Sequence, residues 1–199
     1  MNILAIDTSS DRMVVALSVG EELFWRVGED GAKKHNSQII PTIEEVLESG
    51  GISVGDIDYF ACVVGPGSFT GIRIGVSCVK ALAFACGKKC VAISAFEELA
   101  YGVNDSDFYV CIDCGHGSFY YAKFKEGYLD LVEMGEMTVE DAEKKNRVII
   151  KSAQSDPTRL ITIAKRKIAD FDFSDLMPMY LKKSQAEREY EQNHMDKTV

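Results

Sequence analysis

Three short apolar runs at the start of the chain predict a meander of three β-strands. They cover Asn2–Ile6, Met13–Val19 and Glu22–Val27. The polar residues Asp7 to Ser10 form the first turn, and Gly20-Glu21 forms the second. The first predicted hairpin therefore carries a carboxylate, that of Asp7, at its tip.

The hydrophobic period then changes from that of a strand to that of a helix. Between Asn36 and Glu48, apolar residues recur at offsets 0, 1, 4, 7 and 8 from the first, which is one face of an α-helix. These residues are Ile39, Ile40, Ile43, Val46 and Leu47. Pro41 must lie in the early turns of this helix or kink it. The spacing predicts an amphipathic helix over residues 36–48.

The next unit is organised around the sequence GPGSFTGIRIG, Gly65–Gly75. This sequence follows a predicted strand, Tyr59–Val64, and opens a long helix that runs from Ser68 to Cys86. A further strand, Cys90–Ile93, comes next. A helix to about residue 101 follows it, because Ser94 and Glu97 have the spacing of a capping box.

The second half of the chain repeats the order of strands and helices in the first half. Its predicted strands are Phe108–Asp113, Ser118–Phe124, Tyr128–Glu133 and Val148–Ile150. Its helices begin after the N-caps Thr138 and Asp156, and Pro157 occupies the first helical position of the second. The first strand of each half ends in Asp, and the separation of the two is 113 − 7 = 106 residues. The sequence therefore predicts a duplicated βββαβα unit.

This repeat sets the expected domain organisation. Residues 1–103 would form an N-terminal lobe and residues 104–181 a smaller C-terminal lobe. The apolar residues 176–181 would dock on a lobe, and the charged segment 182–199 would be a tail. Two hairpins with Asp7 and Asp113 at their tips could approach a shared cleft from the two lobes.

The Gly65–Gly75 turn is a candidate phosphate site. Gly65 and Gly67 flank Pro66 and can take positive φ or lie close to another group, while the hydroxyl of Ser68 can cap a helix whose N-terminus suits an anion. A Walker phosphate loop is excluded because no Lys follows Gly71. The possible phosphate-facing residues are Asp7, Thr8, Ser9, Gly65, Gly67, Ser68 and Asp113. The alternative is a structural turn that binds nothing, and the pattern favours that alternative.

Composition narrows the functional classes. With 46% apolar residues the chain is that of a globular protein, and its net charge of −9 argues against binding nucleic acid unaided. Cys111 and Cys114 form one C-x-x-C pair, but residues three apart on a strand point to opposite faces. No metal site is expected from the sequence. The N-terminus has no basic leader before its first strand, so we expect a soluble, cytoplasmic protein with no membrane contact.

The strings ILAIDTSS, HNSQIIP, GPGSFTGIRIG, ALAFACGKKCVAISAFEELA and MPMYLKK closely resemble the TsaB (YeaZ) family. The resemblance is dense over residues 1–101, thin over 104–175, and returns at 177–182. It implies an α/β protein with the actin-like ATPase (ribonuclease H-like) fold, which is built from duplicated βββαβα lobes. Members of this family are accessory proteins in making threonylcarbamoyladenosine on tRNA.

The resemblance also implies that the chain has no catalytic residue. The related catalytic subunit, TsaD, carries two metal-binding His residues four apart, and here those positions fall on Ala95 and Leu99, which cannot bind a metal. No H-x-x-x-H pair occurs anywhere in the chain. His35 starts the first predicted helix at a position that the family shares, and we interpret it as a polar cap.

The resemblance further implies partners and cofactors. The chain would act as a scaffold with a TsaD-like subunit and a TsaE-like ATPase, and would form a homodimer when alone. It would have no cofactor of its own, ATP and magnesium would enter only through the complex, and tRNA would be contacted only indirectly. A self-contained small-molecule kinase or ATPase, with Asp7, Thr8 and Asp113 holding magnesium and phosphates, stays open as the alternative. A metallopeptidase is a third interpretation.

The predicted helices 36–48 and 68–86 supply the candidate partner interface. Their apolar residues are more numerous than one stripe facing a sheet requires, and helices from a second copy or from a TsaD-like subunit could compete for the excess. The predicted interface residues are Ile39, Ile40, Ile43, Ile72, Val76 and Val79. The alternative is that all of them pack inside the chain.

Overall fold

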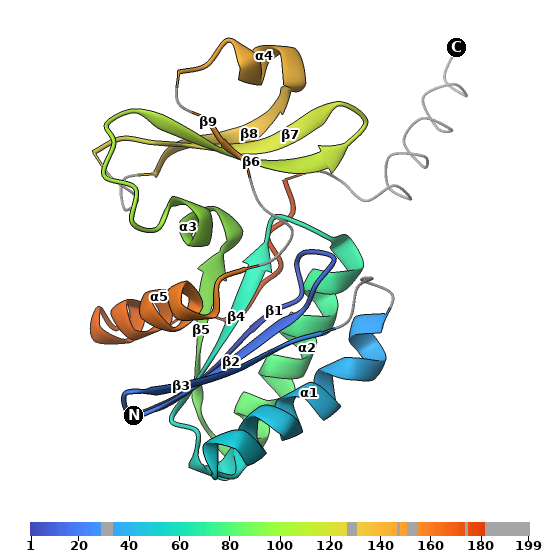
Figure 1. The fold of residues 1–199 in the computed structure, drawn as a ribbon, viewed down its shortest axis with the longest axis vertical. Coiled ribbons are helices and arrows are strands. Elements are labelled where there is room, and N and C mark those ends of the chain that lie inside the picture. The colour runs from blue at the N-terminus through green and yellow to red at the C-terminus, as the bar shows by residue number, and fades with distance from the viewer. Residues whose placement is uncertain (29–33, 127–130, 147, 151–154, 174, 182–199) are drawn as a thin grey trace.

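The chain folds into two β-sheets with helices between and around them (Figure 1). The computed structural model describes residues 1–28, 34–126, 131–146, 148–150, 155–173 and 175–181. The α/β class and the actin-like duplication that the sequence predicts are confirmed.

The first sheet has five strands in the order β3-β2-β1-β4-β5. Its strands are β1 (Asn2–Asp7), β2 (Val14–Val19), β3 (Glu22–Val27), β4 (Tyr59–Gly65) and β5 (Lys89–Ser94). The meander β1–β3 is antiparallel, and β4 and β5 add to it in parallel. Both faces of the sheet are covered, which explains why β1 is apolar at nearly every position.

Two long helices cover one face of this sheet (Figure 1). They are α1 (His35–Gly50) and α2 (Phe69–Cys86), and the short 3-10 helix η2 (Val54–Asp56) lies between them in the chain. Gly51 and Gly87 end α1 and α2 in the left-handed conformation. Pro41 lies inside α1, in its second turn, as predicted.

Helix α2 is long and apolar enough, by length and composition alone, to cross a membrane. Its 18 residues have a mean hydropathy of 1.5, and a third of them are buried inside the protein. The buried third packs on β4, β1 and β5. A core helix of an α/β domain has the same properties, so this helix is weak evidence for a membrane span.

The second sheet repeats the first one in smaller form. Its strands β6 (Phe108–Gly115), β7 (Ser118–Phe124), β8 (Leu131–Thr138) and β9 (Val148–Ile150) have the order β8-β7-β6-β9. That order matches β3-β2-β1-β4 of the first sheet. Helix α4 (Val139–Glu143) lies on its outer face.

The predicted bounds of the third strand of this sheet were wrong. Residues Tyr128–Glu133 were expected, but β8 runs from Leu131 to Thr138, and residues 127–130 lie outside the described part. The strand contains Gly135 and Glu136, residue types that are depleted in strands. Pairing with β7, from Phe124 back to Ser118, extends it.

The two sheets share a core. One face of each sheet, together with α3 (Ala95–Ala100) and α5 (Pro157–Ala169), contributes to a single apolar cluster. Helix α5 follows the second sheet in the chain but packs on β1, β2 and β5 of the first. The predicted division at residues 103 and 104 stays a prediction.

The segment 175–181 returns to the first sheet, as predicted. The side chain of Leu176 is 1% exposed and lies in the core beside α2. The backbone N–H of Met179 donates a hydrogen bond to the carbonyl of Val64 at 2.7 Å. This strap, residues 175–181, is therefore held on the first lobe at the end of β4, and the predicted tail 182–199 lies outside the described residues.

Candidate functional site

The tip of the first hairpin is buried against the start of α2. Asp7, Thr8 and Ser9 are exposed by 0%, 0% and 3%. The N–H of Ser68 donates to the carbonyl of Ser9 at 2.7 Å, and the Thr8 hydroxyl donates to the carbonyl of Gly71 at 2.7 Å. The hairpin tip thus binds the helix N-terminus with its own polar atoms.

Three glycines make this contact sterically feasible. Gly67, Gly71 and Gly75 recur at every fourth residue, and a Cβ at any of them would overlap an oxygen atom of Thr8 or Ser9. The φ of Gly67 is not positive, and a Cβ there would overlap the carbonyl oxygen of Ser9, so of the two predicted reasons for this glycine the close approach to another group is confirmed. Gly65 does have a positive φ, 113°, and it precedes a cis peptide bond to Pro66.

The N-cap residue of α2, Ser68, is also hydrogen-bonded within the chain. The Ser68 hydroxyl accepts the N–H of Gly71 at 3.2 Å, as the N-cap prediction requires. Together with the buried hairpin tip, this cap supports the structural interpretation of the turn. A phosphate-facing role for Gly65, Gly67, Ser68 and the hairpin stays a prediction.

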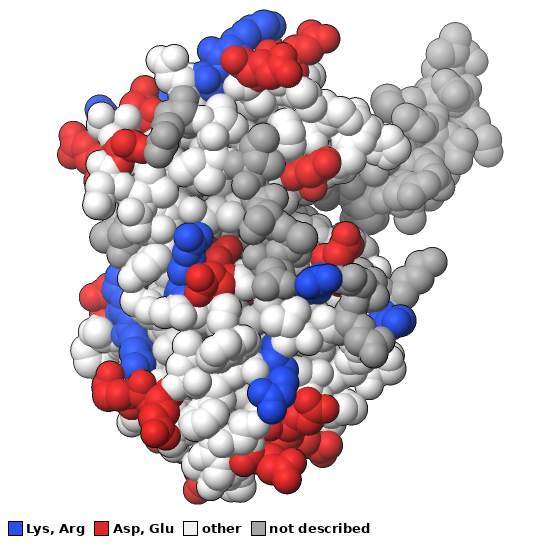
Figure 2. Space-filling model, in the orientation of Figure 1, with Lys and Arg blue, Asp and Glu red and all other residues white. Residues whose placement is uncertain are grey.

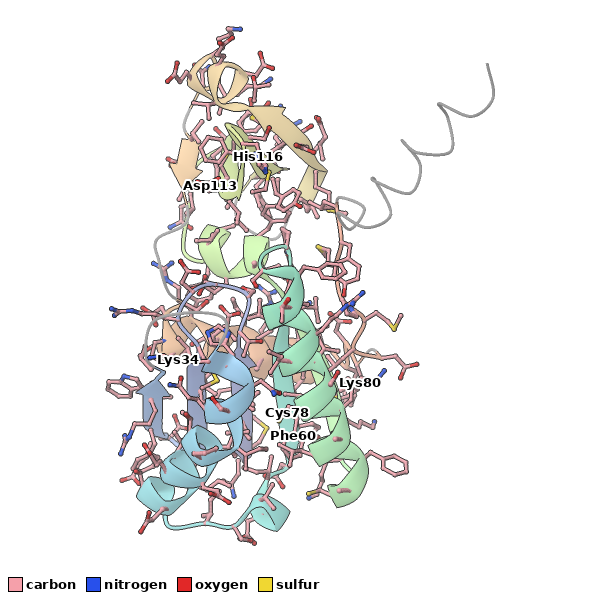
Figure 3. The ribbon with its side chains drawn as sticks, turned by 90° about the vertical axis from the view of Figure 1, so that its right-hand side faces the viewer. Lys34, Phe60, Cys78, Lys80, Asp113 and His116 are labelled. Carbon is pink, nitrogen blue, oxygen red and sulfur yellow. The ribbon has the colours of Figure 1, made fainter. Side chains whose placement is uncertain are left out.

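The two hairpin carboxylates lie in different environments. The Asp7 carboxylate is buried, accepts the N–H of Ser9 at 2.7 Å and accepts a hydrogen bond from the Ser155 hydroxyl. The Asp113 carboxylate is exposed and accepts the N–H of Gly115 at 2.7 Å. Figure 3 shows Asp113 beside His116 on the second sheet. A shared cleft lined by both carboxylates finds no support in these contacts.

Sequence reasoning missed the residues that join α5 to the first lobe. Ser155 reaches Asp7 across 148 positions of the chain, and the buried carboxylate of Glu98 on α3 accepts the N–H of Asp156 at 3.1 Å. Asp156 caps α5 as predicted. Contacts this distant in sequence leave no local signal.

The structure does not favour metal or thiolate chemistry. Within the described ranges, no group of three or more His, Cys, Asp or Glu side chains could hold a metal ion. Burial raises the pKa of Cys111 to about 11 and the pKa of Cys62 well above its ordinary value, so both are thiols at neutral pH. Ala95 and Leu99 are buried on α3. The expected absence of metal from the whole chain stays a prediction.

His35 is buried and is not a helix cap. Its Nε2 lies 3.1 Å from the carbonyl oxygen of Asp11, in the loop of the first hairpin, and the N-cap Lys34 makes no side-chain capping bond. The expected capping role of His35 is therefore wrong. The ring instead ties the start of α1 to the hairpin.

Most of the predicted interface residues pack inside the chain. The buried ones, with their exposed fractions, are Ile39 (4%), Ile43 (3%), Ile72 (1%), Val76 (4%) and Val79 (0%). They face β1, β2 and β4 in the core beneath α1 and α2. Ile40 is 46% exposed and is the one predicted residue that stays on the surface. For the five buried residues the expected surface position was wrong, because helical spacing identifies a stripe without saying which side it faces, while an interface role for Ile40 stays a prediction.

An apolar groove runs between α1 and α2 on the surface. Its volume is about 670 Å³. It is lined by Asn36, Ile39, Ile40, Phe69, Thr70, Arg73, Ile74, Ser77, Cys78, Ala81 and Leu82. In Figure 3, Cys78 points toward α1, whereas Lys80 points away from it. The groove residues that belong to α2 recur at every fourth position, in two rows. The sequence contains this spacing in addition to the spacing of the buried stripe.

Comparisons with known proteins agree with the sequence motifs. A family model described as "TsaD: tRNA N6-adenosine threonylcarbamoyltransferase" matches residues 27–190. The chain is 31% identical over 135 residues to "tRNA threonylcarbamoyladenosine biosynthesis protein TsaB" of Escherichia coli (63% of this chain, 55% of that protein). It is 30% identical over 136 residues to the protein of the same name of Bacillus subtilis (66% of this chain, 59% of that protein).

The fold comparison covers more of the chain. "YeaZ from Pseudomonas aeruginosa" superimposes with a TM-score of 0.76 at 20% identity, over 90% of this chain and 99% of that one. At this identity the likeness concerns the fold alone. The chain spans about half the length of the curated relatives it matches.

Proposed function

The chain belongs to the family of the TsaD model and, within it, to the TsaB (YeaZ) family, and from this premise we propose that it is a non-catalytic subunit in threonylcarbamoyladenosine synthesis on tRNA. One observation carries the proposal. The fold is kept, while the hairpin tip packs on α2 of the same chain, and by the family resemblance Ala95 and Leu99 fall at the positions where the catalytic relative would bind metal. Such a chain contributes through assembly.

The groove between α1 and α2 is the surface that we propose for assembly. It exposes apolar side chains such as Ile40, and apolar surface of this kind marks protein contacts. A TsaD-like subunit of the same fold would lay its own helices against it, and a second copy would occupy it when the chain is alone. The TsaE-like ATPase would join this assembly and bring ATP and magnesium.

The proposed contact with tRNA is indirect and takes place in the cytoplasm. The net charge is −9, and Figure 2 shows Lys and Arg side chains interspersed with Asp and Glu on the face that it presents. Binding to a polyanion needs clustered positive charge, which a partner would have to supply.

The buried hairpin argues against the alternative function, a small-molecule kinase or ATPase. Its magnesium and phosphates would need Asp7 and Thr8 at an open surface, and both side chains are fully buried and hydrogen-bonded. We therefore do not carry it further.

Reconstitution tests the proposal. The chain is combined with the TsaD-like and TsaE-like proteins of its own organism, tRNA, ATP and threonylcarbamoyl adenylate, and the modified nucleoside is measured by mass spectrometry. We expect product only when the chain is present. Product formed equally well without it would contradict the proposal.

A pair of variants tests the surface. Ile40→Glu places a charge in the groove, while Val132→Glu places one on β8, at a side chain that is 54% exposed. Both should stay folded, because both positions are exposed. Only Ile40→Glu should weaken partner binding and modification, and equal behaviour of the two would place the interface elsewhere.

A further inference from the structure

The apolar groove between α1 and α2 contains one charged side chain, that of Arg73. All other lining residues in the part of the chain that the structure describes are apolar or neutral. Arg73 projects from the second turn of α2, and its guanidinium is exposed in the isolated chain. A partner that fills the groove must cover this charge.

The guanidinium of Arg73 is fixed in place before any partner arrives. Its central carbon lies 3.9 Å from the centroid of the Phe69 ring, and its Nε donates a hydrogen bond to the Tyr180 hydroxyl at 2.7 Å. The Phe69 and Tyr180 rings also pack on each other, with centroids 4.8 Å apart. Tyr180 belongs to the strap, so the C-terminal segment holds this side chain at the groove.

These contacts use the Nε of Arg73 and the face of its guanidinium, and neither is a bond of the two terminal nitrogens. Among the described residues, no carboxylate lies within ion-pair distance of them. A guanidinium that is covered without an acceptor is strongly unfavourable, whereas one that receives a carboxylate forms a short, two-point ion pair. The groove therefore selects for a partner that carries an acid at this point.

A second copy of the chain fits this requirement poorly. The described lining of the groove contains no Asp or Glu, so among the described lining side chains two copies meeting groove to groove would offer each other the neutral acceptors Asn36, Thr70 and Ser77. We propose that Arg73 is a specificity-determining residue, which favours a different chain, one that presents a carboxylate on an apolar helical face, over self-association. The inference rests on the proposed function in assigning the groove to a partner.

Removing the charge of Arg73 should change the dissociation constants of the heterodimer and of the homodimer in opposite directions. Arg73→Met keeps the apolar stem and removes the charge. We expect its dissociation constant for the TsaD-like subunit of the same organism to rise about 30-fold or more, since an interfacial charge pair is lost. The homodimer dissociation constant, measured by sedimentation, should fall, because two unpaired charges no longer have to be covered.

Two matched variants and a salt series complete the experiment. Arg73→Lys keeps the charge and should retain part of the affinity and its salt dependence between roughly 50 and 500 mM, which Arg73→Met should lose. Tyr180→Phe removes only the positioning hydroxyl and should cause a smaller loss with unchanged salt dependence. Circular dichroism and thermal melting confirm that each variant is folded.

The outcomes separate the inference from the proposed function. If the wild-type chain does not bind the TsaD-like subunit, the proposed function is contradicted and the inference falls with it. If the wild type binds and Arg73→Met binds within about twofold of it, or if Arg73→Met weakens the homodimer as strongly as the heterodimer, the inference alone is overturned.

Discussion

The two hairpins of the duplicated fold carry the same acidic residue but use it differently. Asp7 at the end of β1 is fully buried and bonded across the molecule to Ser155, whereas Asp113 on β6 is exposed and, among the described residues, bonded only locally to Gly115. Sequence similarity between the halves therefore does not mean equal roles. The environment of each hairpin decides what its carboxylate does.

The difference arises from the helix that follows the fourth strand of each half. In the first half this helix is α2, which begins with a row of glycines onto which the hairpin tip fits. In the second half the corresponding helix is α5, which follows β9, contains no glycine and packs on the first sheet. A close backbone contact needs glycine on one side, and only the first half provides it.

Filling the glycine row should have the largest effect. Gly71→Val would drive a side chain into the Thr8 carbonyl, which backbone packing holds in place, and should lower the free energy of unfolding by about 3 to 5 kcal/mol. Thr70→Val, one residue away and exposed, should change it by less than about 0.5 kcal/mol. Urea unfolding measures both, and equal midpoints would show that the hairpin does not rest on α2.

Removing the two carboxylates compares the hairpins directly. Asp7→Ala leaves the Ser155 hydroxyl and the Ser9 N–H buried without their acceptor and should lower the free energy of unfolding by about 2 to 3 kcal/mol. Asp113→Ala removes an exposed turn contact and should lower it by no more than about 0.5 kcal/mol. Similar losses would contradict the contrast drawn between the hairpins.

A side chain added in the turn of the second hairpin should destabilise the chain only through local backbone strain. Gly117 has a φ of 71°, and a Cβ there would meet no atom within 4 Å. Gly117→Ala should therefore cost about 1 kcal/mol from the left-handed conformation alone. A loss as large as that of Gly71→Val, measured in the same urea titration, would mean that this turn is packed as tightly as the first.

The smallest expected effect on stability comes from the ionisation of Tyr121, on the second sheet. The hydrogen bond from the Tyr121 hydroxyl to Glu133, with a contribution from burial, raises the pKa of Tyr121 to about 12. Because the folded pKa lies above the unfolded value near 10, its small stabilisation is complete below pH 10 and is lost as the pH rises toward 12. Ultraviolet titration should show one late tyrosine that Tyr121→Phe removes. Its persistence in that variant would assign the late step to another tyrosine.

Local patterns in the sequence were sufficient to predict most of the elements. The change of hydrophobic period located α1, and the capping residues Ser68, Ser94 and Asp156 located three helix starts. The third strand of the second sheet was misplaced because Gly135 and Glu136 carry no strand signal, and pairing with β7 determines its bounds.

The candidate site was less predictable, because it depends on which atoms meet in three dimensions. Helical spacing found the apolar residues of α1 and α2 but not that Ile43 and Val79 face the core while Phe69 and Arg73 face the groove. Glutamate at Ile43 or Val79 would therefore test the core and not the interface. Likewise, the sequence predicted that Gly67 takes positive φ or lies close to another group, but not that this group is the carbonyl of Ser9.

The most direct test of the central claim is the modification rate per assembled complex with Asp7→Asn. Asparagine has the shape of aspartate: its Oδ1 can accept the N–H of Ser9, and its NH2 can donate to the Ser155 hydroxyl in place of the bond that Asp7 accepts, so the chain should fold and assemble. If the hairpin is structural, the rate per complex should stay within about twofold of the wild type. A loss of about 100-fold in complexes that assemble with undiminished affinity would show that Asp7 takes part in the chemistry, and would contradict a non-catalytic role.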